Sequence, residues 1–240
     1  PYITEMVDIV HEAGGLCVYD QANANGILGK VRARDTGFDM CHFNLHKTFG
    51  TPHGSGGPGT GASGVTEELA KFLPVPTVEF ENGQYYLDYD RPQSIGKIRS
   101  FLGVSAVVLK AYAWIMNLGA EGLQEVAETA VLNNNYLMSK MLQIRGISAP
   151  YSEGNHRIEQ VRYSWKKLAD ETGIHTEDFM NRAADFALQY YTSHHPFIVP
   201  EPLTLEPTEG VSQADLDEYV SVMEHLSNEA YTDPDLVKTS

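Results

Sequence analysis

The sequence predicts an α/β fold followed by a smaller α+β region, and three observations lead to this prediction. Three strand-like runs alternate with turns in the first part of the chain, as in a mostly parallel sheet; they are residues 16–19, 38–43 and 61–65. A glycine-rich segment at residues 51–61 is unsuited to helix or strand. From Val104 onward helical periodicity dominates, apart from one short strand pair expected around residues 156–161 and 197–205.

The elements of the first region follow from local patterns. Residues 4–13 read as a helix that ends at Gly14-Gly15, a common helix stop. Asn82-Gly83 lies between apolar runs and predicts a β-hairpin over residues 80–90. Residues 104–118 are the most apolar run, but Lys110 breaks it and it is shorter than the ~20 residues that span a bilayer. We therefore expect a buried helix there.

The second region reads mainly as helix. Between residues 123 and 142 the apolar positions fall on one helical face, and Gly146 can end that helix. Residues 176–190 predict another helix, whose inward positions are Phe179, Ala183, Phe186 and Ala187. Ser212 opens a last helix with Asp215 three residues on, a variant of the capping box. We expect a frayed tail after Ala230 and a division into domains at residues 1–118 and 119–240.

Composition excludes some classes of partner. The chain has 240 residues and a formal net charge of −15, which argues against nucleic acid or an anionic membrane, since both require basic patches. The two cysteines, Cys17 and Cys41, fall in apolar strand-like runs and are expected to be buried free thiols. This usage is typical of a reducing cytoplasm.

Lys47 is the main candidate for chemistry. It follows the strand-like run 38–43 and precedes the glycine-rich segment, while Asp20 closes the run before it. A lysine amine bonds to the aldehyde of pyridoxal phosphate (PLP) only when it is neutral, and a carboxylate facing the pyridine nitrogen keeps that nitrogen protonated. Neighbouring strands of an α/β sheet end at one crevice. The pair therefore predicts a PLP site.

Five motifs carry a resemblance to a known family: YDQANAN at 19–25, NLHKTF at 44–49, PHGSGGPG at 52–59, PE at 200–201 and EPTE at 206–209. They resemble the glycine cleavage system P-protein, or glycine dehydrogenase (decarboxylating). The similarity runs nearly end to end and matches the C-terminal part of the PLP-bearing subunit 2. The resemblance implies the aspartate aminotransferase-like fold of fold type I PLP enzymes. Residues 1–118 would then be the C-terminal part of a large domain and 119–240 a small domain.

The resemblance also assigns residues. Lys47 matches the lysine that bonds to PLP, Asp20 the partner of the pyridine nitrogen, Ala22 the small residue packed on the ring, and His46 a neighbour lining the site. Two positions depart from the family pattern, because Gln21 and Ser55 stand where glycine is usual. Neither departure removes a reacting group.

The implied function is release of carbon dioxide from glycine and transfer of the aminomethyl group to the lipoyl arm of H-protein. The implied partners are glycine, lipoylated H-protein, and P-protein subunit 1 or a second copy of the chain. The half of the large domain that cradles the phosphate is not recognised here. We therefore expect this chain alone to bind PLP weakly and to be inactive.

Other interpretations stay open at this stage. The lysine and aspartate pattern also fits other fold type I PLP enzymes, such as amino acid decarboxylases or cysteine desulfurase-like proteins, and a non-catalytic assembly subunit fits the missing half. The alternative for Asp20 is a helix cap, and for His46 a structural histidine. Cys41, His42, His46 and His53 match no zinc spacing, so we expect no metal. His194-His195-Pro196 reads as a surface loop and the 206–209 motif as a turn or a partner entrance.

Overall fold

The computed structural model describes residues 2–152, 154–188 and 197–240. The chain forms two compact units, Pro1–Gln124 and Glu125–Ser240, and each is described by itself. The division at residues 118 and 119 stays a prediction. Within the described ranges, every helix is too short or too polar to cross a bilayer.

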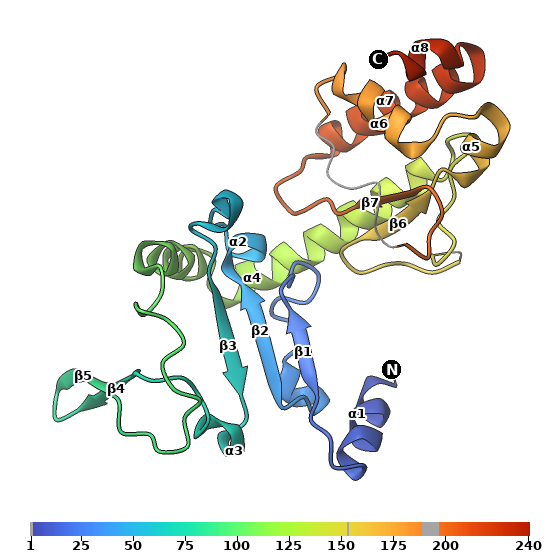
Figure 1. The fold of residues 1–240 in the computed structure, drawn as a ribbon. Helices are drawn as coiled ribbons and strands as arrows, with labels where there is room; N and C mark the ends of the chain where they lie inside the picture. The colour runs from blue at the N-terminus through green and yellow to red at the C-terminus, as the bar shows by residue number, and fades with distance from the viewer. Residues whose placement is uncertain (1, 153, 189–196) are drawn as a thin grey trace. The chain divides into compact units, whose positions relative to one another are not determined.

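A three-stranded sheet forms the centre of the first unit (Figure 1). Its strands are β1 (Val18–Gln21), β2 (Met40–Asn44) and β3 (Gly61–Val65), in the order β1-β2-β3. β1 pairs with β2 in parallel, but β2 pairs with β3 antiparallel, so the prediction of a mostly parallel sheet is wrong for that pair. After β2 the chain makes one helical turn and a glycine loop, and therefore returns along the strand it has just left.

Short elements surround this sheet. The predicted first helix is confirmed as α1 (Ile3–Glu12). The predicted hairpin is confirmed as β4 (Thr77–Glu81) and β5 (Gln84–Asp88), with φ of 51° at Asn82 and 79° at Gly83. Both turn residues are left-handed, as tight hairpins require. The remaining short turns are η1 (Ala33–Thr36), α2 (Leu45–Thr48), η2 (Gly54–Gly56) and α3 (Glu67–Ala70).

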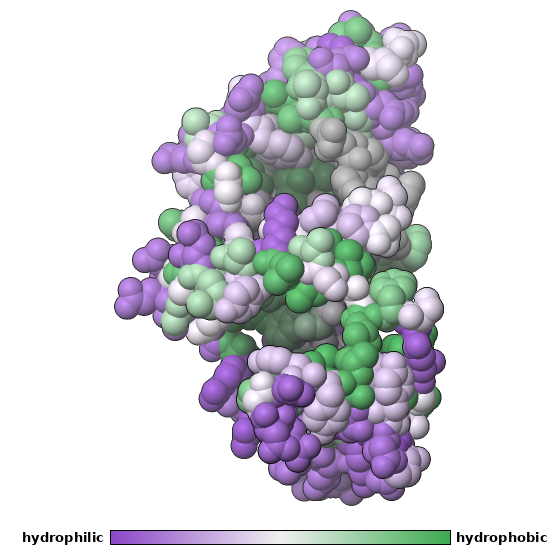
Figure 2. Space-filling view, turned by 90° about the vertical axis from the view of Figure 1, so that its left-hand side faces the viewer, coloured by the Kyte–Doolittle hydropathy of each residue, from purple (hydrophilic) through white to green (hydrophobic). Residues whose placement is uncertain are grey.

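The longest helix, α4 (Ser105–Met141), is interrupted at Gly119, where φ is 66° and ψ −174°. Its first half is not the buried helix that the sequence predicts. Ala111 packs with Leu45 and Phe49 of α2 in a small core, but Leu109 and Met116 are 65% and 63% exposed. Within the first unit, this half of α4 packs through one face, which carries Ala111, Trp114 and Ile115. Figure 2 shows hydrophobic side chains at the surface among hydrophilic ones.

The second unit has a large hydrophobic core. β6 (Val161–Ser164) pairs antiparallel with β7 (Pro202–Leu205), which confirms the predicted α+β arrangement. The helices are the second half of α4, α5 (Lys166–Thr172), α6 (Thr176–Ala184), α7 (Gln213–Thr232) and α8 (Pro234–Lys238). The predicted inward face of α4 is largely confirmed, although Leu142 is exposed. The largest fully buried side chains include Trp165, Tyr163, Phe179, Met141 and Met223.

The helix ends of this unit differ from the sequence prediction in two places. α6 ends at Ala184, so Phe186 and Ala187 are exposed and not inward. The predicted end at Tyr190 lies outside the described residues, as does the motif at 194–196. The tail is not frayed, because Asp233 caps α8 and Val237 is fully buried in the core.

The capping box predicted for the last long helix is confirmed. Ser212 accepts a hydrogen bond from the backbone N–H of Asp215, and the Asp215 carboxylate accepts one from the backbone N–H of Ser212. These bonds satisfy donors that a helix start leaves without partners. The Ser212 hydroxyl also donates to Asp215 Oδ2 at 2.6 Å, and this bond, followed by the one from the Ser212 backbone N–H, lowers the pKa of the Asp215 carboxyl.

One ion pair joins α6 to α7 and makes a testable prediction. Arg182 donates from Nε and Nη2 to the two carboxylate oxygens of Glu229, at 2.9 and 3.0 Å, and both side chains are mostly buried. The pair lowers the pKa of Glu229. We expect Glu229→Gln to lower the free energy of unfolding by about 1–3 kcal/mol at pH 7. Trp114→Phe leaves Trp165 of the second unit as the one tryptophan of the chain. Urea unfolding followed by its fluorescence then measures the free energy of unfolding of this unit.

The penalty should depend on pH with a defined sign. Because the folded pKa of Glu229 lies below its unfolded value of about 4.3, the ion pair stabilises the fold fully above that value. The penalty of Glu229→Gln should therefore shrink as pH falls through the folded pKa. Asp170→Asn removes the exposed pair with Lys166 and should cost no more than about 0.5 kcal/mol. Equal penalties for the two variants would contradict this account.

Candidate functional site

Asp20 and Lys47 lie at the same edge of the sheet. Asp20 is the third residue of β1, and Lys47 lies in α2, the single turn that directly follows β2. Because β1 and β2 are parallel, their carboxyl ends meet at one edge, where α/β folds bind ligands. Both side chains are exposed, that of Asp20 by 74%. The structure thus places at one edge of the sheet the two residues that the sequence singled out.

Asp20 lies inside the strand rather than after it. The predicted strand at 16–19 begins two residues late, at Val18, and continues to Gln21. The Asp20 Oδ1 atom accepts a hydrogen bond from the backbone N–H of Ala22 at 2.9 Å, a local turn and not a helix cap. His42, its partner in the parallel register, places Nε2 3.5 Å from the same oxygen.

Hydrogen bonds tie the turn after β1 to α2. The backbone N–H of Asn44 donates to the carbonyl of Ala22 at 3.3 Å, and the backbone N–H of Ala24 donates to Thr48 Oγ1 at 2.9 Å. Thr48 is buried, as are Leu45 and Phe49 of the same turn. The buried residues on either side therefore fix α2 on the sheet and leave Lys47 pointing to the open edge.

His46 has the environment of a neutral histidine. Burial, and then the positive charges expected at His53 and Lys47, lower its pKa. Its ring lies 4.7 Å from the ring of His53, at an angle of 70°. Its Nδ1 atom is buried and has no hydrogen-bond partner among the described residues. Strand alternation would place His46 opposite Lys47, but β2 ends at Asn44, so both residues belong to a helical turn.

The glycine loop, residues 51–61, follows α2 and leads into β3. Gly54, Ser55 and Gly56 have φ of 51°, 55° and 93°, so Ser55 adopts a left-handed conformation that favours glycine. Glycine, which the resemblance leads us to expect at position 55, would adopt this conformation more readily than serine. A side chain at Gly61 would come within 2.5 Å of the Phe43 carbonyl, so β3 can start here only with glycine.

A pocket of about 360 Å³ lies beside the loop. Its walls come from the end of the loop, including Thr60, and from the segment around the Val75-Pro76 bond. The rest of the lining comes from the residues before α4, including Arg99 and Phe101, and from Val108 in the first turn of α4. Most of these residues are apolar or glycine, but the exposed wall of the pocket is more polar than apolar. The pocket lies at the same edge of the sheet as Lys47, because β3 begins there antiparallel to β2.

Sequence reasoning missed some residues of this edge. His42 entered it only as a metal candidate, whereas the strand register places it against Asp20. Gln21 and Thr51 are buried, and their side-chain oxygens Oε1 and Oγ1 have no partner among the residues described. The sequence contained a signal for His42, because the two predicted strands at 16–19 and 38–43 start 22 positions apart. In a parallel pair with that offset, Asp20 lies opposite His42. The cysteines are free but half-buried, not buried as predicted.

Comparison with known proteins shows which proteins this chain is similar to. Residues 126–235 match the family model described as glycine dehydrogenase, C-terminal domain. The probable glycine dehydrogenase (decarboxylating) subunit 2 of Pyrococcus horikoshii is 50% identical over 240 residues, which are 99% of this chain and 47% of that protein. The protein of the same name from Thiobacillus denitrificans is 47% identical over 98% of this chain and 49% of its own length.

Solved structures show the same fold. A crystal structure of glycine decarboxylase (P-protein) of the glycine cleavage system matches with a TM-score of 0.76 at 18% identity, over 93% of this chain and 51% of that one. A cysteine desulfurase from Thermococcus onnurineus matches with a TM-score of 0.67 at 17% identity, over 94% and 56%. These likenesses confirm the fold type I architecture of PLP enzymes.

The chain thus spans about half the length of the curated relatives it matches. The match extends over almost all of its own residues. Over almost all of its own length, the chain is similar to glycine dehydrogenase (decarboxylating) subunit 2.

Proposed function

We propose that this chain supplies the lysine that anchors PLP in a glycine decarboxylase, the P-protein of a glycine cleavage system. One observation carries the proposal. Asp20, near the end of β1, and Lys47, in the turn after β2, are exposed at the same edge of two adjacent parallel strands. The relatives named glycine dehydrogenase (decarboxylating) subunit 2, at 50% identity, support this reaction over others on the same fold.

The residues present fit PLP. Lys47 and Asp20 are exposed on the open edge, where a ring could contact both. Three buried polar atoms near them in the chain have no partner in the described part of the protein: Gln21 Oε1, His46 Nδ1 and Thr51 Oγ1. Three further atoms of this kind lie in the second unit, so the fit to PLP rests on the position and exposure of Lys47 and Asp20.

Each residue of this edge has a chemical role in the proposal. Bound PLP supplies an electron sink for the bond broken at the amino acid's α-carbon. Lys47 would hold the aldehyde group of PLP through its side-chain amine. Asp20, whose carboxylate accepts the Ala22 N–H and lies beside His42, would hold a proton at the pyridine nitrogen. Ala22 would leave room for the planar ring, because its side chain is small.

His46 completes this description. With its pKa lowered, it stays neutral near pH 7, so one ring nitrogen can donate a hydrogen bond and the other can accept one. It can therefore line the site without adding a positive charge next to Lys47. A positive charge there would make the lysine easier to deprotonate but would also repel the cationic amine of the incoming glycine.

The proposed partners follow from the reaction. The carboxylate of glycine leaves as carbon dioxide, and the remaining aminomethyl group passes to the lipoyl arm of H-protein. The pocket next to the glycine loop, with Phe101 and Val108 in its lining, suits the aliphatic part of such an arm. Subunit 1 of the P-protein or a second copy of the chain would complete the enzyme. The free thiols Cys17 and Cys41 fit a reducing cytoplasm.

Exchange of labelled carbon dioxide into the carboxyl group of glycine tests the proposal. In the intact enzyme we expect exchange that requires both PLP and lipoylated H-protein, and no sulfur release from cysteine. Sulfur release without exchange would favour a cysteine desulfurase-like enzyme, whose fold also matches. Neither activity, in an enzyme that has all its subunits, would favour an assembly subunit.

A further inference from the structure

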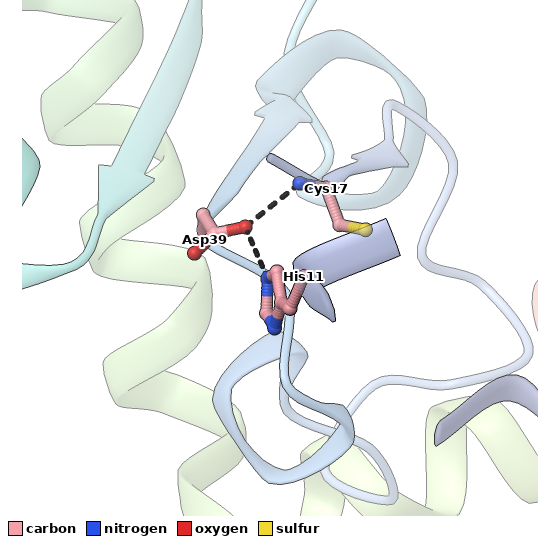
Figure 3. A group of neighbouring side chains, drawn as sticks. All are labelled: His11, Cys17 and Asp39. Atoms are coloured by element: carbon pink, nitrogen blue, oxygen red, sulfur yellow. Dashed lines mark hydrogen bonds and ion pairs between the residues drawn. The ribbon is translucent and has the colours of Figure 1, made fainter. Parts of the chain in front are cut away.

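A second group of side chains lies at the other end of the strands. His11 lies in the last turn of α1, Cys17 directly precedes β1, and Asp39 directly precedes β2 (Figure 3). Their ligand atoms, namely a ring nitrogen, Sγ and a carboxylate oxygen, all lie within 4.8 Å of one another. Asp20 and Lys47 lie at the carboxyl ends of the same two strands, so this cluster is separate from the proposed PLP edge.

The cluster is unusual within this structure. Among the described residues, it is the one group of three His, Cys, Asp or Glu side chains whose ligand atoms come together in this way. It shares no residue with Cys41, His42, His46 and His53, which the sequence offered as metal candidates. The three residues span 28 positions, so no short motif announces them.

The backbone holds two of the three ligands in place. The N–H of Cys17 donates to Asp39 Oδ2 at 2.7 Å, and the N–H groups of Asp39 and Met40 donate to the Cys17 carbonyl at 3.0 and 3.2 Å. These three bonds continue into the pairing of Val18 with Met40 in the sheet. The thiol of Cys17 and the carboxylate of Asp39 are therefore attached to backbone that the sheet hydrogen bonds hold in place.

The third ligand can adjust. His11 Nε2 lies 2.8 Å from Asp39 Oδ2, and its side chain is 37% exposed. Zinc bonds to sulfur, nitrogen and oxygen of roughly 2.0–2.3 Å place tetrahedral ligand atoms roughly 3.2–3.7 Å apart. The largest separation in the cluster therefore has to close by about 1 Å, which a side-chain rotation of Cys17 or His11 supplies. Asp39 Oδ2 keeps its second contact, the backbone N–H of Cys17.

We propose that His11, Cys17 and Asp39 form a binding site for a zinc-type transition metal ion. Nitrogen, sulfur and carboxylate ligands together favour Zn²⁺ or Co²⁺ over Mg²⁺ or Ca²⁺, which prefer oxygen. Three protein ligands leave a fourth position, which water fills on the exposed side of His11. The ion fixes the end of α1 to the starts of β1 and β2, far along the strands from the proposed chemistry.

Cobalt binding tests this site. The intact protein is stripped of metal with a chelator, kept reduced and titrated with Co²⁺. We expect one ion per chain bound with a thiolate-to-cobalt absorption band and visible bands of tetrahedral intensity, both abolished by an equivalent of Zn²⁺. Cys17→Ser should remove the thiolate band and weaken Zn²⁺ binding in equilibrium dialysis by at least about tenfold. Spectra are compared at equal PLP content.

The control is the other cysteine of the chain. Cys41 is in β2, two residues after Asp39. Its Sγ lies next to Gly64 of β3 and is not part of the cluster. Cys41→Ser should keep both the thiolate band and the Zn²⁺ affinity, while His11→Ala should weaken binding without changing the circular dichroism spectrum. A thiolate band that is absent in the wild type, survives Cys17→Ser, or disappears in Cys41→Ser would overturn the proposal and leave a hydrogen-bonded contact between His11 and Asp39.

Discussion

Replacement of Lys47 by arginine is expected to abolish glycine-dependent carbon dioxide exchange by the intact enzyme. Arginine keeps the positive charge but is effectively never deprotonated, so it cannot bond to the PLP aldehyde. A loss of at least about 4 kcal/mol in the barrier corresponds to roughly a thousandfold in rate. The measurement is the initial exchange rate at saturating glycine and H-protein.

The control for this variant is a lysine elsewhere in the same unit. Lys97 is exposed and lies on the loop before α4, so Lys97→Arg should leave exchange unchanged. Because Lys47 is exposed and its buried neighbours Leu45 and Phe49 hold α2 in place, Lys47→Arg should not lower stability. Exchange that persists in Lys47→Arg would mean that another residue anchors the cofactor.

Replacement of Asp20 by asparagine should give the second largest effect. The amide can still accept the hydrogen bond from the Ala22 N–H, so the turn after β1 should keep its shape. A neutral amide no longer holds a proton at the pyridine nitrogen, and the electron sink is weaker. We expect PLP to remain bound and the rate constant to fall by about a thousandfold, or about 4 kcal/mol.

Two further variants separate this role from a structural one. Asp35→Asn removes an exposed carboxylate that pairs with Arg32 in the same unit, and exchange should not change. Asp20→Glu keeps the charge and should recover part of the rate. A rate constant for Asp20→Asn equal to that of the wild type would reduce Asp20 to a turn residue.

Local patterns predicted much of the fold. Asn82-Gly83 specified the hairpin because only residues that tolerate positive φ fit its turn. Ser212 and Asp215 marked the start of α7, since both groups of a capping box lie within four residues. The site could also be predicted in part, because two parallel strands that end near Asp20 and near Lys47 bring these residues to one edge of the sheet.

The errors have a common physical cause, which is that burial depends on tertiary partners. Val237 is buried because α8 packs into the second core, a fact that a short polar tail does not reveal. Leu109 and Met116 are exposed, although their run is the most apolar of the chain. The face of α4 that packs within its unit carries Ala111, Trp114 and Ile115 instead. The pairing of His42 with Asp20 and the cluster at His11 likewise depend on strand register.

Borohydride trapping tests the central claim, that Lys47 anchors PLP, most directly. The intact enzyme is reduced with borohydride in the presence of micromolar PLP, digested, and mapped by mass spectrometry. The account predicts about one pyridoxyl group per chain on the peptide that contains Lys47, and none there after an excess of glycine has displaced the lysine. Stoichiometric label on a different lysine, with Lys47 unmodified, would contradict it.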